Sequence, residues 1–471
     1  MTDTKLYIVL THFDKIEQNR LRKYIRSPYF NANDSLADLY DLFIQNINKN
    51  GKAETLTKEK IWKALYPKEA FNDVRFRKLN SELLKLVEGF LAQEVYEESD
   101  LQRANYLLTA IGKKKIEKLF SNVQRNAGIA ETQQQQKSSD LYYQKYLFER
   151  NYYESMNTDI HRSEKSNIES IIKNLDEFYF AEKIKWYTGL LVKQGHVEHN
   201  YNVPFIDEII EHLKNHNYEH NPVIYVYYKS LLTRIESENE EHYEILVKKL
   251  KNNSSLFSKD ELHDLYLVGL NYCTRKVNLG IPKFTKEFHK LFVFMLDSGI
   301  ALSSGSNGDE LSPWIFKNAV MHSLRLGEYE WVENFIVNYK DKLPKEFRDN
   351  AVSYNLALVY FYQKKFDKVI EQLQEVEYED LGYNLSSKAM LIAIYYEKNE
   401  VILLNSMMDT FRTYLNRHKE ISTIRVVYLN YISFTRKLTK INKGDKTACD
   451  ALRQEIKEAG GVASEKWLLE K

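Results

Sequence analysis

Cysteine, proline and glycine are scarce in this sequence. Its 471 residues include 2 cysteines, 7 prolines and 16 glycines. Cys273 and Cys449 lie far apart and form no Cys-x-x-Cys motif, so neither a disulfide framework nor a zinc knuckle is indicated, and a reducing compartment fits best. An all-β fold needs many turns, for which few glycines and prolines are available. The composition therefore favours long helices.

A charge imbalance is also absent, because 67 basic side chains nearly cancel 66 acidic ones. No global electric field draws in nucleic acid or an anionic membrane. Long apolar runs are missing as well: "LFVFML" at 291–296 stops at Asp297 and is too short to cross a bilayer, and the N-terminal stretch lacks a signal-peptide core. We expect a cytoplasmic protein of two to four folded units, with no membrane partner.

Motifs for catalysis and cofactor binding are missing too. The sequence contains no GxxxxGK[ST], HExxH or GxSxG, and Gly305 and Gly308 lie in a predicted loop rather than a phosphate cradle. His212, His216 and His220 are spaced four apart, and two such histidines can share a zinc ion. No thiolate or organised carboxylate set accompanies them, which favours a surface or packing role. We predict no enzyme activity, cofactor, metal site or small-molecule substrate.

Helical periodicity begins at the N-terminus. Residues 1–128 are predicted to form an N-terminal helical domain of short helices, the first capped by Thr11 and the third capped by Thr57 and ending before Pro67. The following stretch, "NAGIAETQQQQKSSD", loses apolar periodicity and contains a glutamine run. We place a connector at 129–140.

Pairs of amphipathic helices recur from 141 to 300. Helices expected from about 177, 222 and 258 are each followed by a partner, near 205–216, 240–251 and 283–297. Ser258 and Glu261 stand at capping-box spacing, and Pro222 and Pro282 stand where helix starts tolerate proline. The stretch is predicted to be a series of helical hairpins without strands.

The segment 312–420 carries a more specific pattern. In "SPWIFKNAVMHSLRLGEYEWVENFIVNYKDKLP" an aromatic residue, a small residue, a Gly turn and a second apolar helix follow one another, and the pattern returns at offsets of 37 and 35 residues from Tyr329 to Phe366 to Val401. This resembles the tetratricopeptide repeat, a helix-turn-helix unit of about 34 residues. The resemblance implies an all-α array of helical hairpins, an α-solenoid, with the N-terminal domain as a cap and 421–471 as C-terminal capping helices. A compact helical bundle is the alternative, since it would produce the same apolar stripes.

The small residue Ala357 has a reason in such a hairpin. Two helices approach closely only where a small side chain stands at their crossing. A bulky replacement is therefore expected to overpack the crossing and to lower the free energy of unfolding by roughly 1 to 3 kcal/mol.

The resemblance also implies a binding surface. In this repeat family the first helix of each unit lines a concave groove that holds a peptide or a partner helix. By register the groove residues are Lys317, Met321, Arg325, Tyr354, Leu358, Phe361, Tyr362 and Tyr396. Lys317 and Asn318 fit the family's carboxylate clamp, but Met321 stands where a second asparagine is required. The predicted function is a non-enzymatic scaffold for a protein or peptide partner; the alternative for these aromatic residues is burial under neighbouring helices or the C-terminal segment.

A second resemblance concerns "TKEKIWKALYPKEAFNDVRFRKLNSELLKL" at 57–86, which is similar to the two central helices of winged-helix transcription regulators. It implies that Arg75, Arg77, Lys78 and Ser81 face DNA, and that phosphate contacts come from Arg20, Arg22, Lys23 and Arg26. The next stretch, "AQEVYEESDLQRANYLL", is acidic and helical where a β-hairpin wing is required. A DNA-binding regulator is therefore the alternative function, and a helical bundle capping the array is the alternative structure.

Overall fold

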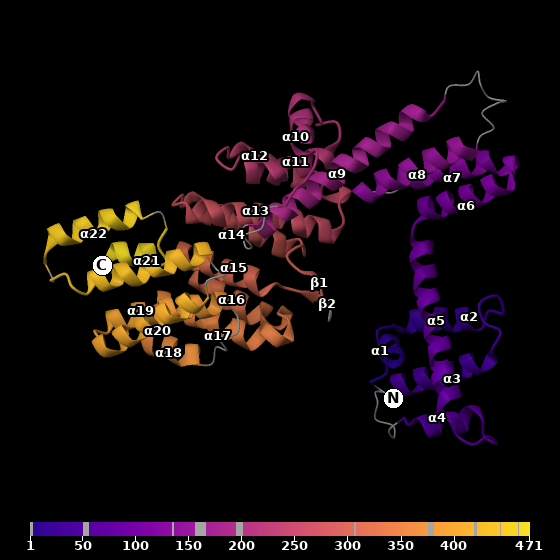
Figure 1. Cartoon of the computed structure of the whole chain (residues 1–471), viewed down its shortest axis with the longest axis horizontal. Helices are drawn as coiled ribbons and strands as arrows, with labels where there is room; N and C mark the ends of the chain where they lie inside the picture. Colours follow the sequence, from indigo (N-terminus) through magenta and orange to yellow (C-terminus); the bar gives the residue numbers. More distant parts are fainter. Residues whose placement is uncertain are drawn as a thin grey trace. The chain divides into compact units, whose positions relative to one another are not determined.

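The computed structural model of the chain is built almost entirely of helices (Figure 1), which confirms the predicted all-α class. The structure describes residues 3–49, 56–133, 136–155, 166–194, 201–305, 308–374, 381–418, 422–442, 444–459 and 461–471. These residues divide into two compact units. The first comprises Met1–Gln134 and Tyr143–Asn174, and the second comprises Gln135–Tyr142 and Leu175–Lys471.

The helices of the first unit, with the two helices that contribute residues to both units, are α1 (Lys5–Thr11), α2 (Lys15–Ile25), α3 (Asp34–Asn48), α4 (Lys58–Leu65), α5 (Asp73–Glu98), α6 (Asp100–Lys114), η1 (Glu117–Leu119), α7 (Phe120–Gln133), α8 (Ser139–Ser155) and α9 (Ile168–Gln194).

Local capping sets the starts of these helices. The prediction that Thr11 caps the first amphipathic helix is wrong, because Thr11 ends the short α1. Asp14 caps α2 instead: its carboxylate accepts the backbone N–H groups of Ile16 and Glu17, and the Glu17 carboxylate accepts the N–H of Asp14. Thr57 caps α4 as predicted.

The first unit has its own core, formed where α1 to α5 pack together. Its fully buried side chains include Leu21, Tyr40, Phe43, Leu83 and Val87, which repeat at helical spacing along α2, α3 and α5.

The boundary of the first unit differs from the predicted connector at 129–140. Helix α7 continues to Gln133 and α8 begins at Ser139. Helix α6 is also hydrogen-bonded to α8: the Asn105 amide donates to the backbone carbonyl of Gln144 at 3.0 Å, and the Asn151 amide donates to Thr109 Oγ1 at 3.4 Å. These long-range bonds assign 143–155 to the first unit, and a local change in composition does not reveal them.

The remaining elements of the second unit are α10 (Ile206–Asn215), α11 (Pro222–Ile235), α12 (Glu241–Asn252), η2 (Ser254–Leu256), α13 (Lys259–Asn278), α14 (Lys283–Asp297), β1 (Ser303–Gly305), β2 (Gly308–Glu310), α15 (Pro313–Leu326), α16 (Tyr329–Tyr339), η3 (Lys340–Lys342), α17 (Lys345–Tyr362), α18 (Phe366–Gln374), α19 (Leu381–Glu397), α20 (Val401–Arg417), α21 (Ser422–Leu438), α22 (Lys446–Glu458) and α23 (Glu465–Glu470).

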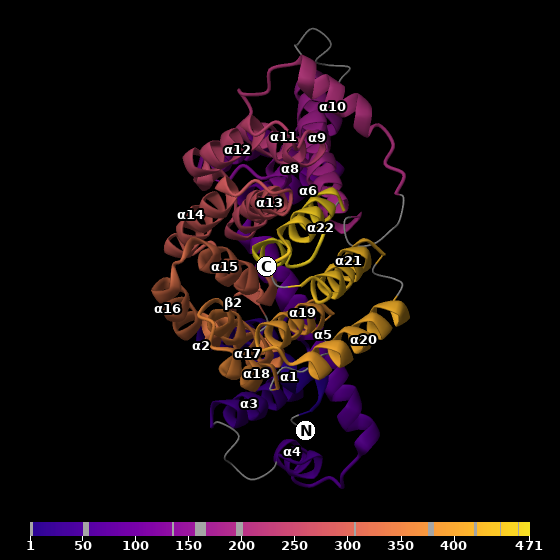
Figure 2. The same cartoon turned by 90° about the vertical axis from the view of Figure 1, so that its left-hand side faces the viewer.

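Successive helices of the second unit pack as hairpins. The pairs α11–α12, α13–α14, α15–α16, α17–α18 and α19–α20 are each in contact, and the second helix of each pair also contacts the first helix of the next pair. First helices touch one another in α11–α13, α15–α17 and α17–α19. Figure 2 shows the pairs from α11–α12 to α17–α18 following one another in chain order.

The core of the second unit runs along this series. One buried apolar cluster extends from Tyr142 through successive hairpins to Ile394, and a second cluster joins α19 and α20 to α21–α23. Ala357, placed at a helix crossing by the sequence, is fully buried within the first cluster.

One predicted loop is a small hairpin. β1 and β2 pair antiparallel, with Ser303 opposite Glu310 and Gly305 opposite Gly308, where the sequence predicts irregular structure without strands. Lys259 at the start of α13 holds the hairpin through an ion pair to Asp309 at 3.0 Å. A three-residue strand is too short to show an alternating pattern in the sequence.

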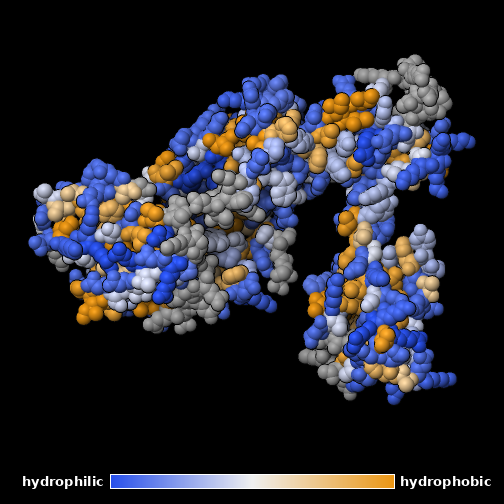
Figure 3. Space-filling model, viewed as in Figure 1, coloured by the Kyte–Doolittle hydropathy of each residue, from blue (hydrophilic) through white to orange (hydrophobic). Residues whose placement is uncertain are grey.

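On the face shown in Figure 3, apolar side chains form separate patches between hydrophilic ones. Among the described residues, none of the helices combines the length and the apolarity that a membrane span requires.

Candidate partner-binding site

A left-handed turn ends each of the three helices that carry the predicted groove residues. Gly327, Lys364 and Asn399 adopt φ values of 82°, 59° and 54°. After each one, a backbone N–H bonds to the carbonyl five residues back: Glu328 to Ser323 at 3.1 Å, Lys365 to Tyr360 at 2.9 Å and Glu400 to Tyr395 at 2.9 Å. This is the Schellman pattern of a helix end. The turn residue stands two positions before Tyr329, Phe366 and Val401, so the geometric register matches the offsets in the sequence.

Before the segment 312–420 the same turn occurs three times among the described residues: at Lys115 after α6, at Gly299 after α14 and, between the two helices of a hairpin, at Gly280. Gly280 has φ 82°, and the N–H of Ile281 bonds to the carbonyl of Lys276 at 3.0 Å between α13 and α14. The hairpin α13–α14 therefore ends its first helix in the same way as the three later pairs.

Lys317 is enclosed by three successive first helices. Its side chain comes from α15 and is 9% exposed. The ammonium donates to Ser386 Oγ at 3.2 Å and to the carbonyl of Gly382 at 3.4 Å, both on α19. It also lies 5.0 Å from the ring centroid of Tyr354 on α17 and 5.3 Å from that of Tyr383. This cation joins α15, α17 and α19 by hydrogen bonds and cation–π contacts.

The burial around Lys317 corrects the prediction that Tyr354 and Leu358 face an open groove. Tyr354 is 2% exposed, and Leu358 is also buried. Burial raises the pKa of the Tyr354 phenol, which stays neutral at any physiological pH. The Tyr428 phenol on α21, within 3.4 Å of Ser386 Oγ, has its pKa raised by burial as well. The centre of the predicted groove is therefore filled by the chain's own side chains.

Four predicted residues remain accessible and form what we call the rim. Arg325 is exposed, and Met321, Phe361 and Tyr362 are half-buried. They lie on the C-terminal halves of α15 and α17, two first helices that contact each other. The rim therefore combines apolar and aromatic surface with a guanidinium group.

Tyr396, the predicted groove residue of α19, is half-buried beneath the segment 461–471. The ring of Trp467 meets Tyr396 edge to face at 5.5 Å. The Trp467 indole N–H donates to Glu397 Oε1 at 2.9 Å, and the Lys471 ammonium pairs with the same oxygen at 2.5 Å. Coverage by the C-terminal segment was the sequence-based alternative, and it describes Tyr396.

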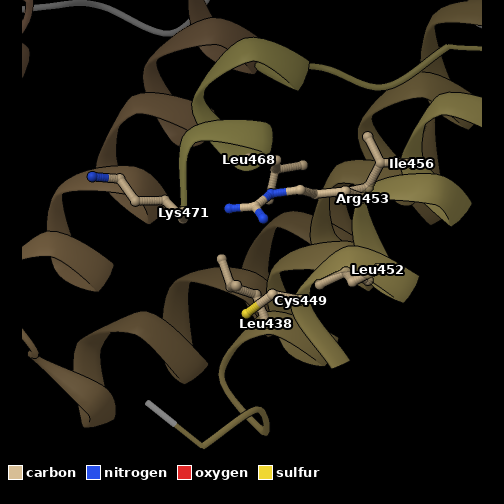
Figure 4. Close-up of a pocket in the computed structure, with 7 residues that line it drawn as sticks. All are labelled: Leu438, Cys449, Leu452, Arg453, Ile456, Leu468 and Lys471. Carbon is tan, nitrogen blue, oxygen red and sulfur yellow. The ribbon is translucent and has the colours of Figure 1, made fainter. Parts of the chain in front are cut away.

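Leu468 fixes the same segment from its other side. Figure 4 shows a small pocket beside α23, between α21 and α22. It is lined by Leu438, Cys449, Leu452, Arg453, Ile456, Leu468 and Lys471. Leu468 is buried in it, and Arg453 Nε donates to the carbonyl of Leu469 at 3.2 Å. Leu468 and the Arg453 hydrogen bond hold α23 against α22, and none of the rim residues lines this pocket.

The residues proposed to face DNA are paired within the first unit. Arg75 binds Glu69 at 2.7 Å and stacks on Tyr66, Arg77 binds Asp73 at 2.5 Å, and Lys78 approaches Glu82 at 3.9 Å. A hydrogen bond from Lys58 and then the charge of Arg77 lower the pKa of Asp73. Ser81 is exposed on α5.

The predicted phosphate contacts and the wing can be placed as well. Arg22 and Arg26 both bind Asp41, Arg20 binds Glu94, and Lys23 is exposed. Helix α5 continues to Glu98 and α6 begins at Asp100, so the described residues have two helices where a β-hairpin wing would stand.

The histidine cluster is held by ring stacking and hydrogen bonds. The rings of His212 and His216 stack at 4.2 Å, His212 Nε2 meets the Tyr218 hydroxyl at 2.9 Å, and His220 stacks on Tyr218. Nowhere in the described part of the chain do three or more His, Cys, Asp or Glu side chains stand where they could hold a metal ion together.

Sequence reasoning missed several residues of the inner face. Trp314 stands three positions before Lys317, and this helical spacing could have placed its ring beside the ammonium, which lies 5.5 Å away. Tyr383, Ser386 and Tyr428 come from other helices, and Trp467 is 70 residues from its acceptor Glu397. Spacing along one helix carries no information on such pairs. Comparisons with protein families, with curated proteins and with solved structures find nothing that matches this chain.

Proposed function

We propose that the protein is a non-enzymatic scaffold, and that its second unit is a helical-repeat array of the tetratricopeptide kind. The observation that carries the proposal is the left-handed turn that returns at one register in three successive hairpins, together with the packing of each hairpin on the next. In repeat proteins each unit contacts mainly its neighbours, and the stacked units build an extended binding surface rather than a chemical pocket.

The rim is the proposed contact surface for a partner. Arg325 supplies a charge that recognises a carboxylate, and Phe361 and Tyr362 supply flat apolar area. Aromatic residues and arginine dominate the energetics of protein interfaces. The partner that fits is a helix or an extended peptide with apolar side chains and at least one acidic residue.

A negative charge introduced at the rim tests this proposal. Phe361→Glu and Arg325→Glu are each expected to reduce capture of partners at least tenfold, as the loss of an interface hot spot does. The measurement is affinity purification of the full chain from its native cell, with quantitative mass spectrometry. Val337→Ser is the matched control, because Val337 is an exposed apolar residue on α16, the second helix of its pair.

Circular dichroism of each variant verifies that the fold is retained. Capture that is equal for wild type, Phe361→Glu and Arg325→Glu would reject the rim. Salt-sensitive retention of the wild type on duplex DNA, lost in a variant with alanine at Arg75, Arg77 and Lys78, would instead support the DNA-binding alternative.

A further inference from the structure

Helix α9 presents an apolar stripe in the second unit that the described residues leave exposed. Leu175, Tyr179 and Trp186 share one face of the helix, and all three are exposed. Trp186 is 70% exposed, and Ile168 and Ile172, in the part of α9 that belongs to the first unit, continue the same spacing with exposed fractions of 43% and 55%. Scattered apolar residues on a surface are ordinary, whereas a row of large ones marks an interaction site.

The spacing of the stripe is that of a helix–helix seam. From Ile168 the steps to Ile172, Leu175, Tyr179, Glu182 and Trp186 alternate four and three residues. This is the alternation of the two core positions of a heptad, which keeps one line of side chains facing a partner helix. The opposite face of α9 is already used, since Ala181 and Ile184 are fully buried in the core of the second unit.

Charges beside the stripe are arranged for self-pairing. Asp176 and Lys183 lie on the same flank, at equivalent heptad positions. Asp176 is exposed and forms no ion pair with any other described residue, and the Lys183 ammonium lies 5.6 Å from the ring centroid of Tyr179. Lys185, on the other flank, is already bound to Glu261 at 3.3 Å.

We propose that α9 pairs antiparallel with α9 of a second copy of this chain. In an antiparallel pair that sets Leu175 opposite Trp186 of the second copy, Tyr179 stands opposite Glu182 and Asp176 approaches Lys183. Each contact occurs twice, as a two-fold axis requires, because the same surface serves on both copies. Glu182 already accepts the Trp186 indole N–H at Oε2 (2.6 Å) and the Ser139 hydroxyl of α8 at Oε1 (2.5 Å), and a further lone pair of the carboxylate can accept the Tyr179 hydroxyl of the second copy.

The charges favour the second copy over an unrelated helix as the occupant. A heterologous helix would need an acid and a base placed by coincidence opposite Lys183 and Asp176, whereas a second α9 brings both at the required positions. The seam is shorter than a sustained coiled coil, so the expected dimer is reversible and depends on protein concentration.

Sedimentation velocity of the full chain over a series of concentrations tests the pairing. The wild type is expected to form a dimer, and Trp186→Ala is expected to weaken it at least tenfold. Asp176→Lys or Lys183→Asp alone sets like charges opposite each other in both symmetric contacts and is expected to weaken the dimer roughly tenfold. The double variant Asp176→Lys/Lys183→Asp is expected to recover the wild-type dissociation constant.

Ile402→Ser is the matched control, because Ile402 is an exposed apolar residue on α20. It is expected to leave the dimer unchanged. A wild type that is monomeric at every concentration overturns the proposal, and so does a dimer that Trp186→Ala leaves intact or a double variant no tighter than the single variants. Each result is independent of the rim and its partner.

Discussion

At the scale of single residues, a few residues in unfavourable conformations or environments lower the free energy of unfolding. Lys364 and Asn399 hold a left-handed backbone that glycine adopts freely, as Gly327 does at the same register. His322 is fully buried against Phe288, with ring centroids 4.1 Å apart. Both features lead to measurable consequences.

Replacing Lys364 with glycine is expected to stabilise the hairpin α17–α18. The left-handed conformation costs an L-residue about 1–2 kcal/mol, and part of the gain is offset by the extra freedom of glycine in the unfolded chain. A net gain of about 0.5–1 kcal/mol should slow amide hydrogen exchange in α17 and α18. Lys365→Gly is the control, because Lys365 has no positive φ. Equal exchange rates in the two variants would contradict the assigned strain.

His322 is expected to make the second unit sensitive to acid. Burial first, and then the charge of Arg325, lower its pKa to about 3 from an ordinary value of 6.5. The unfolded chain therefore binds a proton that the folded chain does not, and the free energy of unfolding falls as the pH drops from 6.5 toward 3. The slope contributed by this residue is at most about 1.4 kcal/mol per pH unit.

His322→Gln removes this titration. Urea unfolding of the second unit at several pH values should show a shallower pH dependence for this variant than for the wild type, while the exposed His220→Gln serves as control. Identical slopes in wild type and His322→Gln would show that the buried imidazole is not responsible.

At the scale of elements, local interactions set the hairpins, whereas long-range contacts set the position of the segment 461–471. Hairpin starts and ends follow local rules: Ser258 and Glu261 form the predicted capping box of α13, and Pro222 begins α11. The segment 461–471 is instead held by distant partners. Glu397 ends α19, where the helix dipole disfavours a carboxylate, and the Trp467 and Lys471 side chains offset that cost.

Trp467→Ala is expected to release α23 from α19 and α21. The half-buried indole loses its hydrogen bond to Glu397 and its contacts with Tyr396 and Tyr431, a cost of about 1–3 kcal/mol. Amides of residues 461–471 should exchange faster by a factor of ten or more. Lys466→Ala, an exposed change on the same helix, should leave the exchange as in the wild type. Unaltered protection in Trp467→Ala would mean that Leu468 alone anchors the segment.

At the scale of the whole molecule, two compact units with separate cores account for the length of the chain. Periodicity predicted the helical class and most helices of the second unit, because the buried face of a helix appears in the sequence as apolar residues at helical spacing. No sequence pattern marks the division between the units at 134–143 and 174–175, because it depends on which helices α8 and α9 pack against.

The candidate site shows the same difference between what one helix predicts and what packing of several helices determines. Register along one helix identified Met321, Arg325, Phe361 and Tyr362 as accessible, and equally placed Tyr354 and Leu358 in a groove. The difference between these two groups comes from neighbouring helices: Lys317 reaches across α17 to Ser386 and closes the space over Tyr354.

The amino-acid sequence by itself determined that this chain is helical and where Thr57 and Ser258 cap helices, because hydrogen bonding and amphipathic spacing act within a few residues. Only the tertiary structure decided which aromatic side chains are covered, that Trp467 lies on Tyr396, and that the apolar stripe of α9 is exposed among the described residues. Those outcomes depend on surfaces brought together from positions far apart in the chain.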